Sequence, residues 1–283
     1  GDYKFLYVSP ERLITDIFRT RVRKMKVNLI VVDEAHCISQ WGYDFRPSYL
    51  KVAELRALLP HVPVLAVTAT ATGEVVKDIQ QKLLFKKQNV LQKSFERKNL
   101  AYVVLKEEDK LARLLKICKN ISGTGIVYVR SRKKTHEIAD YLRKNNIHSD
   151  FYHGGLSPHM RNEKQMNWMN NKSRVIVCTN AFGMGIDKPD VRFVTHLDLP
   201  DSPEGYFQEA GRAGRDGKKA FAILLYNEEG KIDLARNVQY TFPEIAEIKK
   251  TYHALGNFLN LAIGAGENQQ FEFDINNFCT SYK

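Results

Sequence analysis

One short stretch constrains the fold more than any other part of the chain: the apolar residues 29–32, LIVV, which are followed at once by Asp33 and Glu34. A short apolar run rich in β-branched residues predicts a strand buried on both faces, as in a parallel sheet. Ligands of open α/β sheets bind outside the carboxyl ends of such strands. The stretch therefore predicts an α/β fold with two carboxylates at the ligand-binding edge of its sheet.

The two carboxylates suit the binding and hydrolysis of a nucleotide. Asp33 offers the hard oxygen ligands that Mg²⁺ prefers, usually with water between them. Glu34 can orient or deprotonate a water molecule that attacks a γ-phosphate. A simple polar transition from strand to loop would place the same pair here, so the pair alone leaves both interpretations open.

An aromatic loop follows, SQWGYDFRPS at residues 39–48. Gly42 and Pro47 break it too often for a helix or a central strand. Its side chains Trp41, Tyr43, Phe45 and Arg46 either plug a core or form a stacking surface for nucleic-acid bases.

The length and charge of the chain limit its class. At 283 residues it has room for two domains of ordinary size, and Lys and Arg exceed Asp and Glu by eleven. This balance suits a polyanion such as nucleic acid, although a basic protein without such a partner would show it too. No run is long enough for a membrane span and no signal peptide is visible, so we expect a cytoplasmic protein, nucleoid-associated if bacterial.

The four cysteines, at positions 37, 118, 178 and 279, are far apart in the sequence. They form no CxxC pair, so we expect neither a zinc site nor a disulfide framework. Reduced thiols also fit a cytoplasmic protein.

Taken together, DEAH at 33–36, the aromatic loop and QEAGRAGRDG at 208–217 resemble the RecQ family of DNA helicases, from about Tyr7 to about Tyr226. The resemblance implies an α/β protein with two RecA-like domains that contain parallel sheets. We expect the incomplete first domain at 1–93, the second at 94–228, and the start of a truncated, mostly helical accessory region at 229–283. It also implies an ATP-dependent 3′→5′ helicase that binds ATP, Mg²⁺, and single-stranded and duplex DNA, and acts in DNA repair and recombination.

Several strand ends in the second half carry residues that suit this chemistry. Gly183 and Gly185 let the backbone approach a ligand closely, and Asp187 can accept a hydrogen bond from a ribose hydroxyl. Arg212 and Arg215 lie three residues apart, which on a helix places them on one face. Guanidinium groups suit a γ-phosphate, and Arg215 is our preferred arginine finger.

The residues and the resemblance together give five expected groups of site residues. The catalytic residues are Glu34, Arg212 and Arg215, and Asp33 binds the metal. The nucleotide-binding residues are Gly185, Asp187 and Gln208. The residues that couple the ATP and DNA sites are His36, Thr68 and Thr70. The DNA-binding residues are Ser9, Trp41, Phe45, Arg46, Arg130, Ser131, His153 and Thr179.

Two features depart from a complete RecQ motor. No GxxxxGK[ST] phosphate loop is present in the sequence. We expect that loop ahead of Gly1, and we expect the chain alone to lack ATPase activity. Many RecQ proteins also carry a cysteine-rich zinc module after the motor, but only Cys279 follows Tyr226, so we expect no zinc.

Two other functions remain open: an RNA helicase of the same superfamily, and a non-catalytic nucleic-acid-binding truncation. Comparing stimulation of the ATPase by DNA and by RNA would separate the first from a DNA helicase. The ATPase of the complete protein would test the second.

Apolar periodicity and turn residues also predict individual elements. Strands are expected at 5–8, 29–32, 62–67, 125–129, 149–152, 175–178, 193–196, 221–226 and 271–274. Helices are expected at 49–59, 73–84, 110–120, 135–144, 160–169, 228–238 and 243–260.

Overall fold

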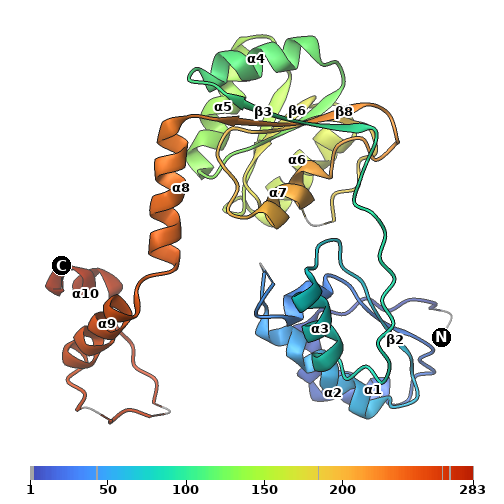
Figure 1. Ribbon diagram of the computed structural model, residues 1–283, viewed down its shortest axis with the longest axis vertical. Coiled ribbons are helices and arrows are strands. Elements are labelled where there is room, and N and C mark those ends of the chain that lie inside the picture. The colour runs from blue at the N-terminus through green and yellow to red at the C-terminus, as the bar shows by residue number, and fades with distance from the viewer. Residues whose placement is uncertain (1–2, 43, 184, 263, 268, 283) are drawn as a thin grey trace. The chain divides into compact units, whose positions relative to one another are not determined.

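The computed structural model describes residues 3–42, 44–183, 185–262, 264–267 and 269–282 (Figure 1). The chain divides into two compact units, residues 1–226 and 227–283. The first unit contains two separate parallel sheets, one of two strands and one of six. This confirms the expected α/β class with parallel sheets.

The smaller sheet pairs β1 (Ile30–Val32) with β2 (Val64–Ala66) in parallel register. Its core comes from the strands and from α1 (Asp16–Val22), α2 (Val52–Leu58) and α3 (Gly73–Lys82). Three 3₁₀ segments connect these elements: η1 (Pro10–Ile14), η2 (Ala35–Ile38) and η3 (Pro47–Lys51). The predicted helix at 49–59 is therefore divided between η3 and α2.

The strand expected at 5–8 is wrong. Phe5 and Tyr7 are exposed, and neither sheet of the described residues includes this segment. A strand needs a neighbour for its backbone hydrogen bonds, and apolar composition alone does not provide one.

The larger sheet has the strand order β3-β8-β7-β4-β6-β5, and every neighbouring pair is parallel. Its strands are β3 (Leu100–Lys106), β4 (Thr124–Tyr128), β5 (Ser149–Tyr152), β6 (Val175–Cys178), β7 (Val191–His196) and β8 (Ala220–Tyr226). Every residue of β4 and β6 is buried. Such apolar strands are typical of a sheet that is covered on both faces.

Helices cover both faces of the larger sheet (Figure 1). Side chains of α4 (Lys110–Asn120) and α5 (Arg132–Lys144) pack in one core, and side chains of α6 (Pro158–Met169) and α7 (Pro203–Ala210) pack in the other. All four helices begin at an N-cap side chain that accepts a backbone N–H: Asp109, Ser131, Ser157 and Ser202. These caps explain why the helix starts follow polar residues so closely.

The second unit contains α8 (Glu228–Thr241), α9 (Ile245–Phe258) and α10 (Ile275–Ser281). The strand expected at 271–274 is wrong, and α10 was not predicted. Phe273 packs edge-on against Phe258, and the Asp274 carboxylate caps α10 by accepting from the Asn276 and Asn277 amides. Phe273 thus packs against α9.

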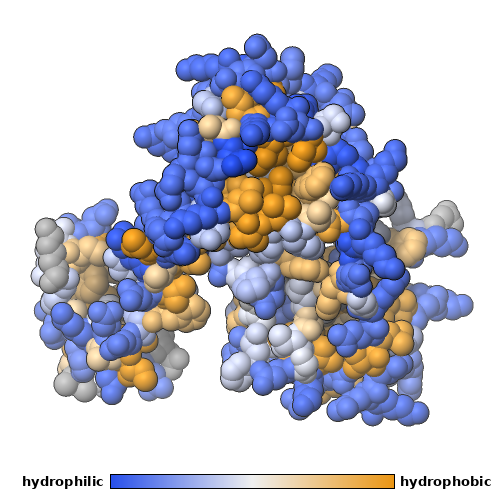
Figure 2. All heavy atoms as spheres, turned by 45° about the horizontal axis from the view of Figure 1, so that its top comes forward, coloured by the Kyte–Doolittle hydropathy of each residue, from blue (hydrophilic) through white to orange (hydrophobic). Residues whose placement is uncertain are grey.

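Apolar side chains also reach the surface (Figure 2). Val31 and Leu65, which are partners in the register of the small sheet, are 55% and 47% exposed. Within the described part of the chain, no helix is long and apolar enough to cross a membrane.

Candidate functional site

The first group of predicted residues lies where β1 and β2 end side by side. The Val67 amide donates to the Val32 carbonyl, and the Ala35 amide donates to the Val67 carbonyl. The Glu34 amide in turn donates to Asp33 Oδ1 at 2.9 Å. The carboxylates therefore lie at the carboxyl edge of the sheet, as the sequence predicts. Asp33 is exposed there, which fits a carboxylate that holds hydrated Mg²⁺.

Glu34 has an unusual backbone conformation. Its φ of 48° and ψ of 43° lie in the left-handed region, which non-glycine residues seldom occupy. Residues held in this region cluster at functional sites, where the surrounding structure enforces them. Burial and the neighbouring Asp33 charge raise the pKa of Glu34 above its ordinary value. The direction suits a general base, because such a base works best when its pKa approaches the working pH.

A chain of polar contacts joins Glu34 to the end of β2. His36 is buried, and its Nδ1 lies 3.4 Å from Glu34 Oε2 and 3.0 Å from Thr68 Oγ1. The Thr68 hydroxyl donates to the Thr70 carbonyl and therefore accepts from His36 Nδ1–H. The structure thus brings together the three residues predicted to couple the sites.

Burial favours the neutral form of His36. It lowers the pKa of the ring below the ordinary value, because a buried imidazolium loses its hydration. A neutral ring has a single N–H, and the contact with the Thr68 hydroxyl assigns that hydrogen to Nδ1.

The aromatic loop leaves the site in close contact with the DEAH backbone. The Arg46 amide donates to the Cys37 carbonyl at 2.8 Å. A Cβ added to Gly42 would lie 2.6 Å from the His36 carbonyl oxygen, so only glycine allows this approach. A shift of the loop would therefore act directly on the backbone of His36.

The side chains of the loop divide between solvent and partial burial. Trp41 is 75% exposed, so it does not plug a core. Phe45 is partly buried beneath Lys82 Nζ, which lies 5.8 Å from its ring centroid. Arg46 forms an ion pair with Asp44 at 2.6 Å. Tyr43 lies outside the described residues.

Asp44 is a residue that the sequence interpretation missed. Its only sequence signal was a carboxylate two residues before Arg46. It orients Arg46 and also lies 3.8 Å from Cys37 Sγ. The ligand atoms of His36, Cys37 and Asp44 lie within 4.8 Å of one another, but burial raises the pKa of Cys37 to about 11. The neutral thiol disfavours a zinc site there, because zinc binds the thiolate.

Ser9 lies at the start of η1, whose residues pack near η3 at the end of the aromatic loop. Its side chain makes no capping hydrogen bond to η1. The Ser9 side chain instead contacts the Glu11 carboxylate. Hydrogen bonds from the backbone of Glu11 and from the Ser48 and Ser9 hydroxyls lower the pKa of Glu11.

Four predicted DNA-binding residues lie at the carboxyl edge of the larger sheet. They follow the neighbouring strands β4, β6 and β5, and the Thr179 amide donates to the Tyr152 carbonyl at 3.2 Å. Arg130 forms an ion pair with Asp201, and Ser131 caps α5 by accepting from the Lys134 amide. The parallel order of the strands therefore gathers Arg130, Ser131, His153 and Thr179 on one edge.

His153 combines burial with an unused polar atom. Its Nδ1 is buried and has no hydrogen-bond partner among the described residues. Burial, followed by the nearby Arg132 charge, lowers the pKa of the ring. A neutral histidine beside an arginine suits a contact with a polyanion better than acid–base catalysis.

The two candidate arginines do not lie on a helix, so that expectation is wrong. Helix α7 ends at Ala210, and residues 211–217, called the arginine turn below, form successive turns. Gly211 after the helix is still right-handed, but Gly214 and Gly217 have φ values of +63° and +78°, so no helix can run on through Arg215. Left-handed conformations of this kind end a helix.

The arginine turn contacts the segment that follows β6. Arg212 Nη1 donates to the Gly183 carbonyl, and Arg215 forms an ion pair with Asp187 at 2.7 Å. A Cβ on Gly183 would lie 2.7 Å from Arg212 Nη2. Gly185 has a φ of +77° with open space around it, which a bound ligand could use. Gln208 lies in the last turns of α7 and is partly buried.

Comparisons with known proteins agree with this arrangement. Residues 1–79 match the DEAD/DEAH box helicase family model, and residues 107–217 match the helicase conserved C-terminal domain model. The chain is 43% identical over 254 residues to the probable ATP-dependent DNA helicase RecS of Bacillus subtilis, which covers 87% of this chain and 51% of that protein. It is 44% identical over 231 residues to the ATP-dependent DNA helicase RecQ of the same organism, covering 81% and 39%.

A solved structure supports the fold. An S. cerevisiae Dbp5 variant bound to Gle1 superposes with a TM-score of 0.61 at 23% identity, covering 84% of this chain and 61% of that one. Identity this low bears on the fold alone. The chain spans about half the length of the first curated relative and about two fifths of the second.

Proposed function

Because this chain belongs to the RecQ family of superfamily 2 helicases, we propose that it is the motor region of an ATP-dependent DNA helicase. The protein couples ATP hydrolysis to 3′→5′ movement along single-stranded DNA. It thereby unwinds duplex DNA during repair and recombination.

The chain of polar contacts from Glu34 through His36 to Thr68 and Thr70 is the observation that carries this proposal. It joins the residue proposed to act on water with a strand end proposed to respond to DNA. His36, at the centre of this chain, is buried and has few alternative arrangements, so a shift at one end changes the other.

ATP and Mg²⁺ are the expected substrate and metal. The metal supplies positive charge that neutralises phosphate oxygens during transfer. Asp33 holds it, and Glu34 orients the attacking water. On the second sheet, Gly185, Asp187 and Gln208 bind the nucleotide, while Arg215 stabilises the charge that develops in the transition state and Arg212 assists it.

DNA contacts come from both sheets. The exposed Trp41, with Phe45 and Arg46, offers a surface on which bases stack. The carboxyl edge of the larger sheet offers Arg130, Ser131, His153 and Thr179 for the phosphate backbone, with Ser9 as a further contact. Closure of the two sheets on ATP and opening after hydrolysis moves the motor along one strand.

The substitution Glu34→Gln tests the proposal in a form of the protein that includes the phosphate-binding loop. It removes the base but keeps the size of the side chain, so turnover should fall on the order of 10²-fold or more while Mg²⁺-ATP still binds. Steady-state ATPase assays with and without single-stranded DNA measure this. Near-normal turnover by a folded variant would reassign Glu34 to a structural role.

The nucleic acid and the direction are tested separately. Single-stranded DNA should stimulate the ATPase more than single-stranded RNA of the same length. Duplexes with a 3′ tail should be unwound, and those with a 5′ tail should not. Preferential stimulation by RNA would instead favour an RNA helicase of the same superfamily.

A further inference from the structure

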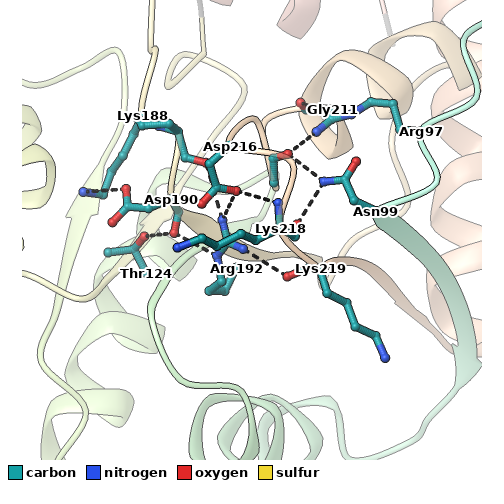
Figure 3. Close-up of polar contacts among 12 residues, drawn as sticks. Arg97, Asn99, Thr124, Lys188, Asp190, Arg192, Gly211, Asp216, Lys218 and Lys219 are labelled. Carbon is teal, nitrogen blue, oxygen red and sulfur yellow. Dashed lines mark hydrogen bonds and ion pairs between the residues drawn. The ribbon is translucent and has the colours of Figure 1, made fainter.

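The arginine turn is held by side chains from the segment that leads into β3. Arg97 Nη1 donates to the Gly211 carbonyl at 2.8 Å, and Arg97 Nη2 donates to the Gly214 carbonyl at 2.5 Å (Figure 3). One guanidinium group therefore bridges two carbonyls of the turn, on either side of Arg212. A planar group with fixed N–H directions is suited to such a bridge.

Asn99 adds two contacts beside those of Arg97. Its Nδ2 donates to the Gly214 carbonyl at 2.7 Å and to the Lys218 carbonyl at 2.9 Å (Figure 3). The Asn99 carbonyl accepts from the Ala220 amide at the start of β8. Asn99 is thus fixed by the sheet, and it fixes the turn in its place.

The opposite side of the turn is held by β7 and the residues before it. Arg192 forms an ion pair with Asp216 at 2.6 Å and donates to the Lys219 carbonyl (Figure 3). The Gly214 amide donates to the Val191 carbonyl at 2.8 Å. The turn is therefore held from two sides, by the sheet and by the segment at 97–99.

The turn has little rigidity of its own. Gly214 has a φ of +63°, and a Cβ there would lie 2.7 Å from Asn99 Nδ2 and 2.8 Å from the Ala220 Cβ. Glycine allows this close approach, but it also leaves the backbone many other conformations. The orientation of Arg212 and Arg215 consequently depends on the groups that bind the carbonyls around them.

We propose that Arg97 and Asn99 form a linker latch: positioning residues that orient Arg212 and Arg215 toward the nucleotide. This proposal rests on the proposed function, because it assigns the arginine turn to ATP hydrolysis. Residues 93–99 lie between α3, which packs with the smaller sheet, and β3 of the larger sheet, so they belong to the segment that links the two sheets. The latch therefore connects the linker itself to the arginine turn, so tension in the linker changes the position of the arginines.

Hydrogen–deuterium exchange of this chain tests the latch without any activity. Arg97→Ala and Asn99→Ala should speed exchange of the amides at 211–218 by about tenfold or more, because the turn loses its side-chain donors. Exchange in β4 and β6 should stay unchanged. The matched control is Arg113→Ala, which removes the ion pair between Arg113 of α4 and Glu107, the residue after β3. It should leave amide exchange at 211–218 unchanged. Unchanged exchange at 211–218 in both latch variants would overturn the proposal.

Kinetics of a form that includes the phosphate-binding loop test the positioning role. Arg97→Ala should lower kcat about tenfold or more and leave the KM for ATP within about twofold. Binding of a transition-state analogue, ADP with aluminium fluoride, should weaken while binding of ADP is retained. Arg97→Lys should restore part of kcat, because an ammonium group can bond one carbonyl well but lacks the planar fork.

The outcomes separate the latch from the proposed function. If the turn exchanges faster but kcat is unchanged, the positioning role is wrong. An equal loss in kcat and in ADP affinity would show that Arg97 only stabilises the fold. That result would also overturn the positioning role. Absence of ATP hydrolysis by the wild-type protein would refute the proposed function, and the exchange experiment would still decide whether the latch holds the turn.

Discussion

Trp41 provides the sharpest test of the aromatic loop, because its exposure separates binding from stability. Complete loss of a buried aromatic side chain costs about 3–5 kcal/mol. Trp41 is 75% exposed, so Trp41→Ala should lower the free energy of unfolding by only about 1 kcal/mol. One stacked base contributes roughly 1–3 kcal/mol, which corresponds to about 5-fold to about 150-fold weaker binding of single-stranded DNA.

The second tryptophan of the chain is a natural control. Trp168 is fully buried and donates from Nε1 to the Gly125 carbonyl at 3.2 Å. Trp168→Ala should therefore lower the free energy of unfolding by about 3–5 kcal/mol. Trp168→Phe keeps most of the apolar volume and leaves Trp41 as the only tryptophan, because the sequence contains two.

Intrinsic fluorescence is the assay. In the Trp168→Phe background, titration with oligo-deoxythymidine should quench Trp41, since a stacked base contacts its ring directly. A Trp41→Phe variant with Trp168 intact should show little change on the same titration. The stacking hypothesis is refuted if saturating DNA leaves Trp41 fluorescence unchanged and Trp41→Ala binds DNA within about twofold of the wild type.

Two further predictions concern the catalytic residues. Arg215→Ala should lower kcat on the order of 10³-fold with ATP affinity nearly retained, because a finger acts on charge that develops in the transition state. Stopped-flow binding and turnover measure both quantities, and an equal fall in affinity would make Arg212 the better candidate. Burial lowers the pKa of His36, so the unfolded chain takes up a proton at a higher pH than the folded one does. Stability should thus fall as pH drops through the unfolded pKa of about 6.5 and level off below the lowered folded pKa. Melting temperatures between about pH 7.5 and pH 5.5 should fall less steeply in His36→Gln, and an unchanged slope would argue against a buried neutral ring.

Elements with strong local signals were predictable from the sequence. Strands β5 and β6 and helix α4 occur at the predicted bounds of 149–152, 175–178 and 110–120. In α4, apolar spacing and the Asp109 cap agree, and in β6 an apolar run is bounded by turn residues. Local and tertiary preferences coincide at these places.

Elements that depend on a distant partner were not predictable in this way. Residues 5–8 have strand composition but lack a neighbouring strand among the described residues. The arginine turn has helical spacing, yet Gly214 adopts a left-handed conformation that is fixed by Asn99, more than a hundred residues away in the sequence. Spacing within one segment carries no information about such contacts.

The candidate site shows the same division. The resemblance named His36 and Thr68 as coupling residues, and their contact follows from the parallel pairing of β1 and β2, whose carboxyl ends lie at one edge. The contacts of Asp44 and Arg97 were not predictable. A single carboxylate or guanidinium group in a loop forms no sequence pattern that indicates which residue it will contact. Their roles follow only from the contacts they make.

The left-handed backbone of Glu34 has a consequence for anyone who redesigns this chain. A non-glycine residue in a sparsely populated conformation costs on the order of 1–3 kcal/mol, whereas asparagine and glycine tolerate the left-handed region far better. A calculation that ranked substitutions by stability alone would therefore replace Glu34 among the first residues. The variant that it favoured would fold more firmly and would lack the carboxylate proposed to act on water. Position 34 should be held fixed in any stabilised version of the protein, and stability should be sought in the helices that cover the larger sheet.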